Sequence, residues 1–423
     1  MAAGLLVRLN VCKSWACPNL GVPDAMDYQQ PVYRLGYPAL HCARCGSLPP
    51  LFNEPLFNGW FSRFLAQKLK QSGTGCPHCA SALTIRYGTT QTGRQRLQCR
   101  ACRKIFTPWQ PGDKALRHIQ ACLAALARGE TGGDRACYRT LAQAADWCEA
   151  RLVERAHRAA HIATQTFTVP MQGEHPQQPL YVVLSADIVT GQVLQVTSSY
   201  CEWKPHEALR YPGGEAVHPA LRLCGALRVR EQEAQFMRRR QFDDIRYGDA
   251  ALCRNDPGAL LRPAIVIHGH FQWLRRRFPE VLSHSLAHEC VLRGAAITAW
   301  AAQVSAGKTQ LRFVVEETLN ERAAGGAYVH RGSWRIGWWN NLWQQWENGA
   351  TRKMIGMLTG EDDPGDIPTV SLQACMAFTD WLRLQPGVAR WGHHRAGVVS
   401  QQLICLAYRY NQQLMAQRTA EPR

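Results

Sequence analysis

Runs of apolar residues in the second half of the chain predict a β-sheet. Residues 180–200, LYVVLSADIVTGQVLQVTSSY, hold two β-rich runs around a polar turn that begins at Asp187. We therefore expect a hairpin whose first strand ends at this aspartate. LRFVVEE at 311–317 predicts another strand, and PAIVIHGHF at 263–271 is interpreted as a further strand. Together with the helical patterns below, these runs indicate a mixed α/β domain.

Other stretches repeat apolar residues at the spacing of an amphipathic helix. FSRFLAQKLKQ at 61–71 predicts one helix. Residues 113–165, rich in Ala, Leu and Arg with a Gly-rich break at 129–133, predict two or three short helices. These helices fit a helix-turn-helix or a plain helical spacer. We also expect a helical stretch at about 285–306 and a Trp-rich amphipathic helix that carries Glu347.

Length and charge point to several domains and to a polyanionic partner. The chain has 423 residues, which at roughly 150 residues per domain predicts two to four domains. Its net charge is +17, and residues 1–169 hold 21 Lys/Arg against 9 Asp/Glu, whereas the remainder holds 28 against 23. A basic excess at the N-terminal end favours a polyanionic partner, because Lys and Arg displace the counterions of a phosphate backbone. An anionic membrane surface is the alternative, but no basic amphipathic helix with a full apolar face is present in the sequence to bind it.

The cysteines and the hydropathy favour a cytoplasmic protein. A disulfide scaffold suits small secreted chains, and this chain with 17 cysteines is long. Eight of the cysteines lie in the first 102 residues as paired clusters, which is typical of metal binding in a reducing compartment. No apolar run is long enough to span a membrane, and MAAGLLVRLN is too short for a signal peptide.

The first cysteine cluster has the composition of a structural zinc site. Cys12-x4-Cys17 is followed by a gap of 24 residues and then by Cys42-x-x-Cys45, directly before Gly46. Four thiolates close the tetrahedron that structural Zn²⁺ requires, and each short turn supplies two of them. The first pair is wider than the usual spacing, so four free thiols are the alternative.

The second cysteine cluster carries the stronger signal. Cys76-Pro-His-Cys79 and Cys99-Arg-Ala-Cys102 are two C-x-x-C pairs separated by 19 residues. Two such pairs at this distance predict a second zinc site. A redox function for C-P-H-C is the alternative, but the βαβ context of that motif is missing.

The segment between these pairs predicts a basic zinc ribbon. LTIRYG and RQRLQC are short alternating strands joined by the polar turn TTQTG. From Cys76 to Phe106 there are six basic residues and no acidic one. We expect these residues to contact DNA phosphates: Arg86, Arg94, Arg96, Arg100, Arg103 and Lys104.

The order of these parts resembles that of bacterial insertion-sequence transposases. The resemblance lies in a ribbon that reads C-P-x-C, then Y-G, then G-x-Q-R-x-x-C-x-x-C-x-x-x-F, over about thirty residues. The matching positions are Cys76, Tyr87, Gly88, Gly93, Gln95, Arg96, Cys99, Cys102 and Phe106. A helix-turn-helix usually follows such a ribbon in that family, and an RNase H-like domain forms the C-terminal half.

The resemblance implies a site for two divalent metal ions held by carboxylates, in which Mg²⁺ or Mn²⁺ would support DNA cutting and joining. Asp187 ends the first strand of the predicted hairpin, where the family has its first aspartate; a plain turn cap is the alternative. Glu316 and Glu317 are candidates for the second acid, although the family has an aspartate there. Glu347 is a candidate for the third.

We therefore expect a multidomain α/β protein with two N-terminal zinc ribbons, a helix-turn-helix-like segment and an RNase H-like domain. The expected boundaries are 1–60 for the first ribbon, 61–110 for a helix plus the second ribbon, and 111–170 for the helical segment. Residues 177–423 would form the RNase H-like domain, with an insertion at about 201–262.

Three functions remain open. The first is a zinc-containing, transposase-like DNA-binding protein that cuts and joins DNA. The second is a domesticated relative without catalysis that regulates through DNA binding, and the third is a zinc-stabilised scaffold for protein interactions. DNA is the expected partner, a homodimer is left open, and no membrane partner is expected.

Overall fold

The structure is a computed structural model of the whole chain. It describes residues 6–32, 38–72, 75–79, 81, 83–108, 111–130, 135–153, 157–171, 179–210, 223–237, 258–323, 325–337, 339–360 and 362–420.

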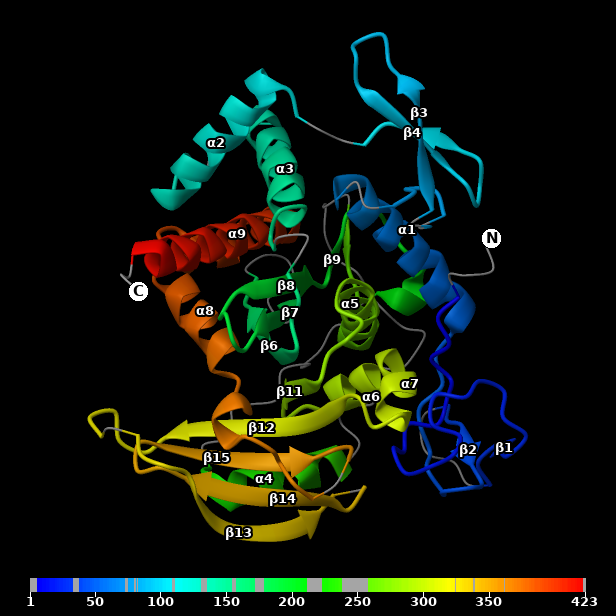
Figure 1. Cartoon of the computed structure of the whole chain (residues 1–423), viewed down its shortest axis with the longest axis vertical. Helices are drawn as coiled ribbons and strands as arrows, with labels where there is room; N and C mark the ends of the chain where they lie inside the picture. The colour runs from blue at the N-terminus through cyan, green and yellow to red at the C-terminus, as the bar shows by residue number, and fades with distance from the viewer. Residues whose placement is uncertain are drawn as a thin grey trace.

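A mixed sheet of eight strands forms the centre of the molecule (Figure 1). Its strand order is β13-β14-β15-β12-β11-β6-β7-β8. The central strands β6, β11 and β12 run parallel, and their neighbours on both sides run antiparallel. The strands are β6 (His161–Val169), β7 (Leu180–Asp187), β8 (Val193–Ser198), β11 (Ser283–Ala287), β12 (Gln310–Thr318), β13 (Val329–Ile336), β14 (Asn341–Glu347) and β15 (Thr351–Met357).

Helices cover both faces of this sheet, as β7 illustrates. All eight residues of β7 are buried, which explains why its sequence is a continuous apolar run and not an alternation. Tyr181 and Val183 belong to the core under one set of helices, and Val182 and Leu184 belong to the core under the other. The first set is α5 (Pro263–Arg277), α6 (Cys290–Ala299) and α7 (Ala301–Ser305), and the second is α8 (Gln373–Arg383) and α9 (Ala396–Ala420).

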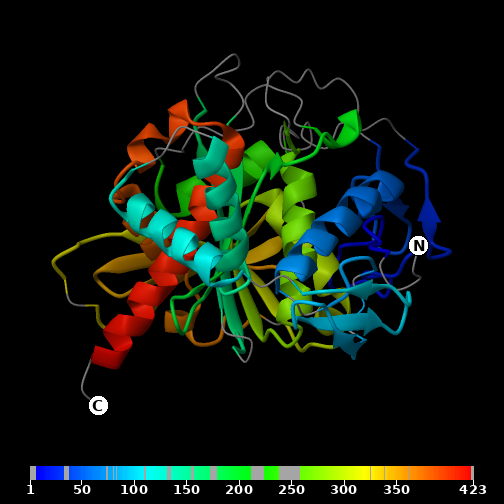
Figure 2. The same ribbon diagram turned by 90° about the horizontal axis from the view of Figure 1, so that it is seen from above.

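The N-terminal third of the chain lies around this core. Figure 2 shows α1 and the ribbon β3–β5 on one side of the molecule, and α2 and α3 beside α9 on the other. None of the described helices is long and apolar enough to cross a membrane. The elements are β1 (Tyr28–Gln29), β2 (His41–Cys42), α1 (Glu54–Ser72), β3 (Thr84–Thr89), β4 (Gln95–Cys99), β5 (Ile105–Phe106), α2 (Asp113–Ala127) and α3 (Arg135–Glu149).

The expected insertion at about 201–262 is only partly described, because residues 211–222 and 238–257 lie outside the described part of the chain. Its described elements are β9 (Tyr200–Cys201), η1 (Glu207–Leu209), α4 (Gly225–Met237) and β10 (Ala259–Leu260). β9 pairs with β10, which brings the start and the end of the segment together. The remaining short helices are η3 (Ile367–Thr369) and η4 (Val388–His393).

Helix α1 attaches the N-terminal modules to the core by a close approach to α5. The ring of Trp60 lies over Gly269, and a Cβ atom on this glycine would be 2.5 Å from the indole. Trp60 also stacks on Phe64, with 5.3 Å between ring centroids. At the first turn of α1, Glu54 accepts hydrogen bonds from the backbone amides of Leu9 and Asn10, both at 2.7 Å.

Several predicted elements are confirmed. The hairpin at 180–200 is the pair β7–β8, and LRFVVEE lies within β12. The helix at 61–71 is the second half of α1, so the expected boundary after residue 60 falls inside a helix. The two ribbon strands are β3 and β4.

The prediction of a strand at 263–271 is wrong, because this segment begins the helix α5. An apolar run without alternation fits a buried strand and an all-round buried helix equally well. Pro263 stands in the first turn, where a proline needs no backbone hydrogen bond, and three arginines occupy the last turn. His268 and His270 therefore lie on different sides of α5.

The prediction of a Trp-rich helix that carries Glu347 is also wrong. This segment forms β14, in which Trp343 is fully buried and lies opposite Gly356 of β15. The tryptophan spacing fits a helix by coincidence. The stronger signal is Asn348-Gly349, the dipeptide typical of tight hairpins, and Gly349 has φ +85°.

Two helical predictions extended into strands. Residues 285–287 belong to β11, and the helices α6 and α7 begin only at Cys290 and Ala301. The helical segment expected to reach about residue 165 ends at Glu149 as α3, and His161–Val169 is the strand β6. β11 has only five residues, and in β6 the apolar residues are interrupted by Gln165 and three threonines; both strands lie in the centre of the sheet, where packing against their neighbours determines their conformation.

Gly269→Ala is expected to lower the free energy of unfolding by about 1–3 kcal/mol, because the added methyl group collides with Trp60. Gly59→Ala in α1 is the matched control, since nothing lies within 4 Å of its Cβ position. This control should gain up to about 1 kcal/mol from helix propensity. Urea unfolding measures both changes; an unchanged Gly269→Ala variant would contradict the close contact.

Candidate metal centres and nucleic-acid interface

The first cysteine cluster has the geometry of a four-thiolate metal centre. The sulfur atoms of Cys12, Cys17, Cys42 and Cys45 all lie within 4.8 Å of one another. The Cys12–Cys45 and Cys17–Cys42 sulfur pairs are 3.5 and 3.9 Å apart. A tetrahedron with zinc–sulfur bonds of about 2.3 Å has edges of about 3.8 Å. The cluster can therefore hold a zinc ion.

Tight backbone turns set the spacing of these ligands. The amide of Gly46 donates to the carbonyl of Cys42 at 2.8 Å, and Gly46 has φ +71°. This left-handed conformation is the reason a glycine follows the C-x-x-C pair. The amide of Gly21 donates to the carbonyl of Cys12 at 3.0 Å and closes the wider loop around Cys17.

The second cluster has the same geometry at the base of the ribbon. The sulfur atoms of Cys76, Cys79, Cys99 and Cys102 also lie within 4.8 Å of one another. The Cys76–Cys102 and Cys79–Cys99 sulfur pairs are 3.6 and 3.5 Å apart. Cys99 is the last residue of β4. This cluster too can hold a zinc ion, with two ligands on each side of the β3–β4 hairpin.

The basic residues lie on the surface of the ribbon without acidic partners, on both faces of the β3–β4 pair, since Arg86 lies opposite Leu97 and Arg96 faces Tyr87. We call it the basic ribbon surface, and it consists of Arg86, Arg94, Arg96, Arg100, Arg103 and Lys104. All of them are exposed except Arg96, which is half-buried. Within the described part of the chain, no ion pair involves any of these six residues.

Two exposed arginines elsewhere in the protein do have acidic partners. Arg128 pairs with Glu130 at 2.7 Å, and Arg383 pairs with Asp380 at 3.0 Å. Among the described basic side chains of the ribbon, Arg96 contacts an aromatic ring: its guanidinium lies 5.9 Å from the ring centroid of Tyr87. The ribbon therefore presents uncompensated positive charge to solvent.

Helix α3 is packed against the core and not free on both sides. Its buried residues include Leu141, Ala144 and Cys148, and Trp147 contacts Tyr408 of α9 at 5.3 Å between ring centroids. Its last residue, Glu149, is ion-paired with Lys68 of α1. One face of this helix of the expected helix-turn-helix-like segment is thus occupied by the protein itself.

Asp187 lies at the end of β7 and caps the turn that follows. Its carboxylate accepts hydrogen bonds from the Thr190 hydroxyl at 2.6 Å and from the Val189 amide at 3.3 Å, and His157 Nε2 lies at 3.1 Å. Burial raises the pKa of this carboxyl group, but these contacts outweigh burial and hold the pKa below its ordinary value of 3.8.

The other predicted acids are bound by basic side chains. Glu316 lies 3.3 Å from Lys353 Nζ and accepts a hydrogen bond from the Ser371 hydroxyl. Glu317 and Glu347 both contact Arg352, at 3.4 and 2.7 Å. The structure therefore brings Glu317 and Glu347 together around one guanidinium, while Glu316 is on the opposite face of β12.

Asp187 does not join these glutamates. The strand register places Asp187 level with Ile162, His284 and Leu311, at one end of the parallel strands. Glu316 lies five residues farther along β12, which is about 16 Å along the strand, and β7 is three strands away from β12. The four acids therefore do not converge on one point.

Sequence reasoning missed one acid at the other end of the parallel strands. Glu289 lies two residues after the end of β11, contacts the Thr166 hydroxyl, and accepts a hydrogen bond from the Tyr181 hydroxyl at 3.0 Å. Burial raises its pKa above the ordinary value. The preceding His288 bonds Glu233 of α4 at 2.9 Å. A strand at 283–287, hidden by the helical prediction, was the missing signal.

Comparison with known proteins gives one structural similarity. No protein-family model matches the sequence, and no curated protein matches it. A solved structure, a piggyBac transposase synaptic complex with hairpin DNA, is similar at 8% sequence identity with a TM-score of 0.27. The alignment covers 87% of this chain and 76% of that chain. A similarity at this TM-score carries no conclusion about this chain.

Cys99→Ser is expected to remove one of two zinc ions per chain, because a structural centre loses affinity when one of four thiolates is lost. Cys224→Ser changes an exposed cysteine outside both clusters and should keep full zinc content. Elemental analysis of the purified proteins measures the ratio. Full zinc content in the Cys99→Ser protein would refute this ligand set.

Asp187→Asn is expected to destabilise the protein by about 1–3 kcal/mol at pH 7, because the turn loses a charged hydrogen-bond acceptor. A lowered pKa means that the carboxylate stabilises the fold above pH 3.8 and that this contribution disappears as the pH falls through the folded-state pKa. The difference in melting temperature from the unmodified protein should therefore shrink below pH 4 or so. An equally stable variant that loses Mn²⁺ binding would instead indicate a metal ligand.

Proposed function

We propose that this chain is a zinc-containing DNA-binding protein of transposase-like architecture, and that the basic ribbon surface contacts the DNA backbone. The observation that carries the proposal is the set of six cations without a described acidic partner on one small zinc-stabilised module. Cations already engaged in ion pairs gain little from a new anion. Unpaired ones release counterions from DNA when they reach its phosphates.

The residue types of the basic ribbon surface support contact with the DNA backbone. They do not by themselves indicate recognition of the DNA sequence. Arg and Lys side chains on short strands position a protein on DNA through phosphates. Tyr87, which is exposed beside Arg96, adds an aromatic face to the same strand pair. The zinc ion would supply the folding free energy of a module too small for a large apolar core.

The arrangement of the sheet supports the transposase-like part of the proposal. Three consecutive antiparallel strands, β6, β7 and β8, are followed along the chain by β11 and β12. β11 and β12 add to the other side of β6 in parallel orientation. A mixed sheet of this kind is what the resemblance to insertion-sequence transposases implies for an RNase H-like domain.

We propose that the protein binds DNA but that the four predicted acids do not form a joint centre for strand cleavage. A two-metal centre requires carboxylates that converge within a few ångströms. Asp187 lies at the opposite end of the strands from Glu316, and Glu317 and Glu347 are held by Arg352. Of the functions considered from the sequence, the non-catalytic DNA-binding relative fits this geometry best.

The double variant Arg94→Ala/Arg96→Ala is expected to bind duplex DNA about tenfold more weakly at physiological salt. The slope of log affinity against log salt should fall by about two, one for each phosphate contact removed. Fluorescence anisotropy with a mixed-sequence duplex at several salt concentrations measures both quantities.

The matched control is Arg128→Ala/Arg383→Ala, which removes the same charge from exposed arginines that already have acidic partners. Equal affinities and slopes in the two double variants would exclude the basic ribbon surface from the interface. Weak binding that is insensitive to salt in the unmodified protein would favour the protein-interaction scaffold.

A further inference from the structure

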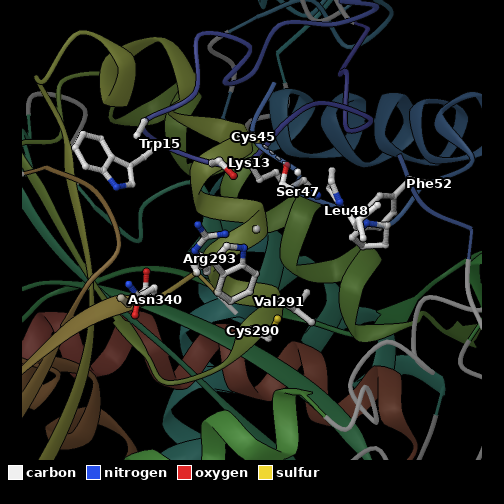
Figure 3. Close-up of a pocket in the computed structure, with 18 of the residues that line it drawn as sticks. Lys13, Trp15, Cys45, Ser47, Leu48, Phe52, Cys290, Val291, Arg293 and Asn340 are labelled. Atoms are coloured by element: carbon white, nitrogen blue, oxygen red, sulfur yellow. Dashed lines mark hydrogen bonds between the residues drawn. The ribbon is translucent and has the colours of Figure 1, made fainter. Parts of the chain in front are cut away.

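A pocket lies between the first cysteine module and the core, beside the place where Gly21 contacts Ala301. Its volume is about 460 Å³, which is in the range of small-molecule sites. One wall is the loop from Lys13 to Trp15 together with Cys45 and its neighbours, and the other wall is the start of α6 (Figure 3). Trp339 and Asn340, from the turn before β14, form a third side.

Two buried cations line this pocket without an acidic residue. The exposed fractions of Lys13 and Arg293 are 7% and 2%. Among the described residues that line the pocket there is no aspartate or glutamate, and neither cation forms an ion pair with another described residue. Glu233, which does not line the pocket, attracts Arg293 electrostatically without forming an ion pair. Buried charges are costly unless they are paired, so this arrangement favours an anionic ligand.

Further hydrogen-bond donors in the pocket lack partners. The buried Nε of Arg293 and the buried amide nitrogen of Asn341 make no hydrogen bond within the described structure. The Arg293 guanidinium stacks on Trp339, at 3.9 Å from the ring centroid. Stacking occupies the flat face of the guanidinium and leaves its in-plane N–H groups for a ligand with several acceptor oxygens.

The thiolate centre next to the pocket compensates only part of the positive charge of Lys13 and Arg293. Four thiolates around Zn²⁺ carry two negative charges, which would lower the cost of two nearby cations. However, the sulfur atoms of Cys12, Cys17 and Cys42 belong to buried residues, and only Cys45 lines the pocket. The centre therefore cannot satisfy the donors of Arg293 and Asn341 on the far wall.

The aromatic side chains narrow the class of ligand. Trp15 is 44% exposed at the edge of the pocket, and Phe52 lies within it. Figure 3 shows the indole of Trp15 across the open space from Arg293 and Asn340. An exposed tryptophan opposite a pair of cations offers a stacking surface for a base and a binding site for its phosphate.

We propose that this pocket binds a nucleotide, with its phosphate at Lys13 and Arg293 and its base against Trp15. The nucleotide is either free or the unpaired end of a DNA strand, since both present the same phosphate and base. The site shares no residue with the basic ribbon surface. A test of this site is therefore independent of whether the ribbon binds duplex DNA.

The test is titration of the zinc-loaded full-length protein, followed by tryptophan fluorescence and calorimetry. The probes are dAMP, inorganic phosphate, and a short single strand with and without a 5′-phosphate. Arg293→Gln and Trp15→Ala should each weaken binding of dAMP about tenfold or more. Arg383→Gln removes one exposed charge far from the pocket and should bind as the unmodified protein does.

The results of the titrations distinguish a free nucleotide from a strand end, and both of these from simple binding of phosphate. Tight binding of dAMP identifies a free nucleotide, and binding of only the 5′-phosphorylated strand identifies a strand end; both support the proposal. Binding of inorganic phosphate as tight as that of dAMP, with no effect of Trp15→Ala, overturns the nucleotide assignment.

Two further results would overturn the site itself. One is dAMP binding that is unchanged in Arg293→Gln. The other is no binding of any probe together with zinc loss in Arg293→Gln, which would mean that the cations serve only to balance the thiolate centre. Because Trp15 is exposed and Trp15→Ala should fold normally, the proposal stays testable if Arg293→Gln is unstable.

Discussion

The contact between α1 and α5 is the constraint on which the N-terminal half depends. Both cysteine modules connect to the core through α1, one before its first turn and one after its last. Trp60 can lie on α5 only because position 269 has no side chain. Any larger residue there would separate the two helices and move both modules relative to the sheet. This backbone position therefore contributes to the placement of the metal centres, together with the direct contact of Gly21 in the first module with Ala301 of α7.

Charge compensation divides the cations of this protein into two groups. In the core, Lys353 lies beside Glu316 and donates to the backbone carbonyls of Ile367 and Val370, and Arg352 bridges two glutamates. These cations hold strands and loops together. On the ribbon and in the pocket beside α6, the cations form no ion pair with another described residue. The contrast separates structural charge from charge that is available to a ligand.

The sequence predicted local structure well and the arrangement of distant parts poorly. The C-x-x-C pairs are local, so both clusters could be identified from spacing, as could the hairpin after Asp187. PAIVIHGHF was misread because burial on all sides removes the periodicity that distinguishes helix from strand. The candidate acids do not converge because the strand register places Asp187 and Glu316 at opposite ends of the strands. The sequence of either segment alone does not determine this register, so the prediction failed. Lys13 and Arg293 are 280 positions apart, so only the fold reveals their pocket.

The length of α1 has a consequence for how a nucleic acid could engage this protein. Phe52, which lines the pocket, precedes the helix, and the ribbon follows its last turn. The 19 residues of α1 span about 28 Å. This length corresponds to about eight base pairs at 3.4 Å each. A rigid helix of this length fixes the distance between the pocket and the ribbon: under the two proposals above, a strand whose end enters the pocket would meet the ribbon about eight base pairs away.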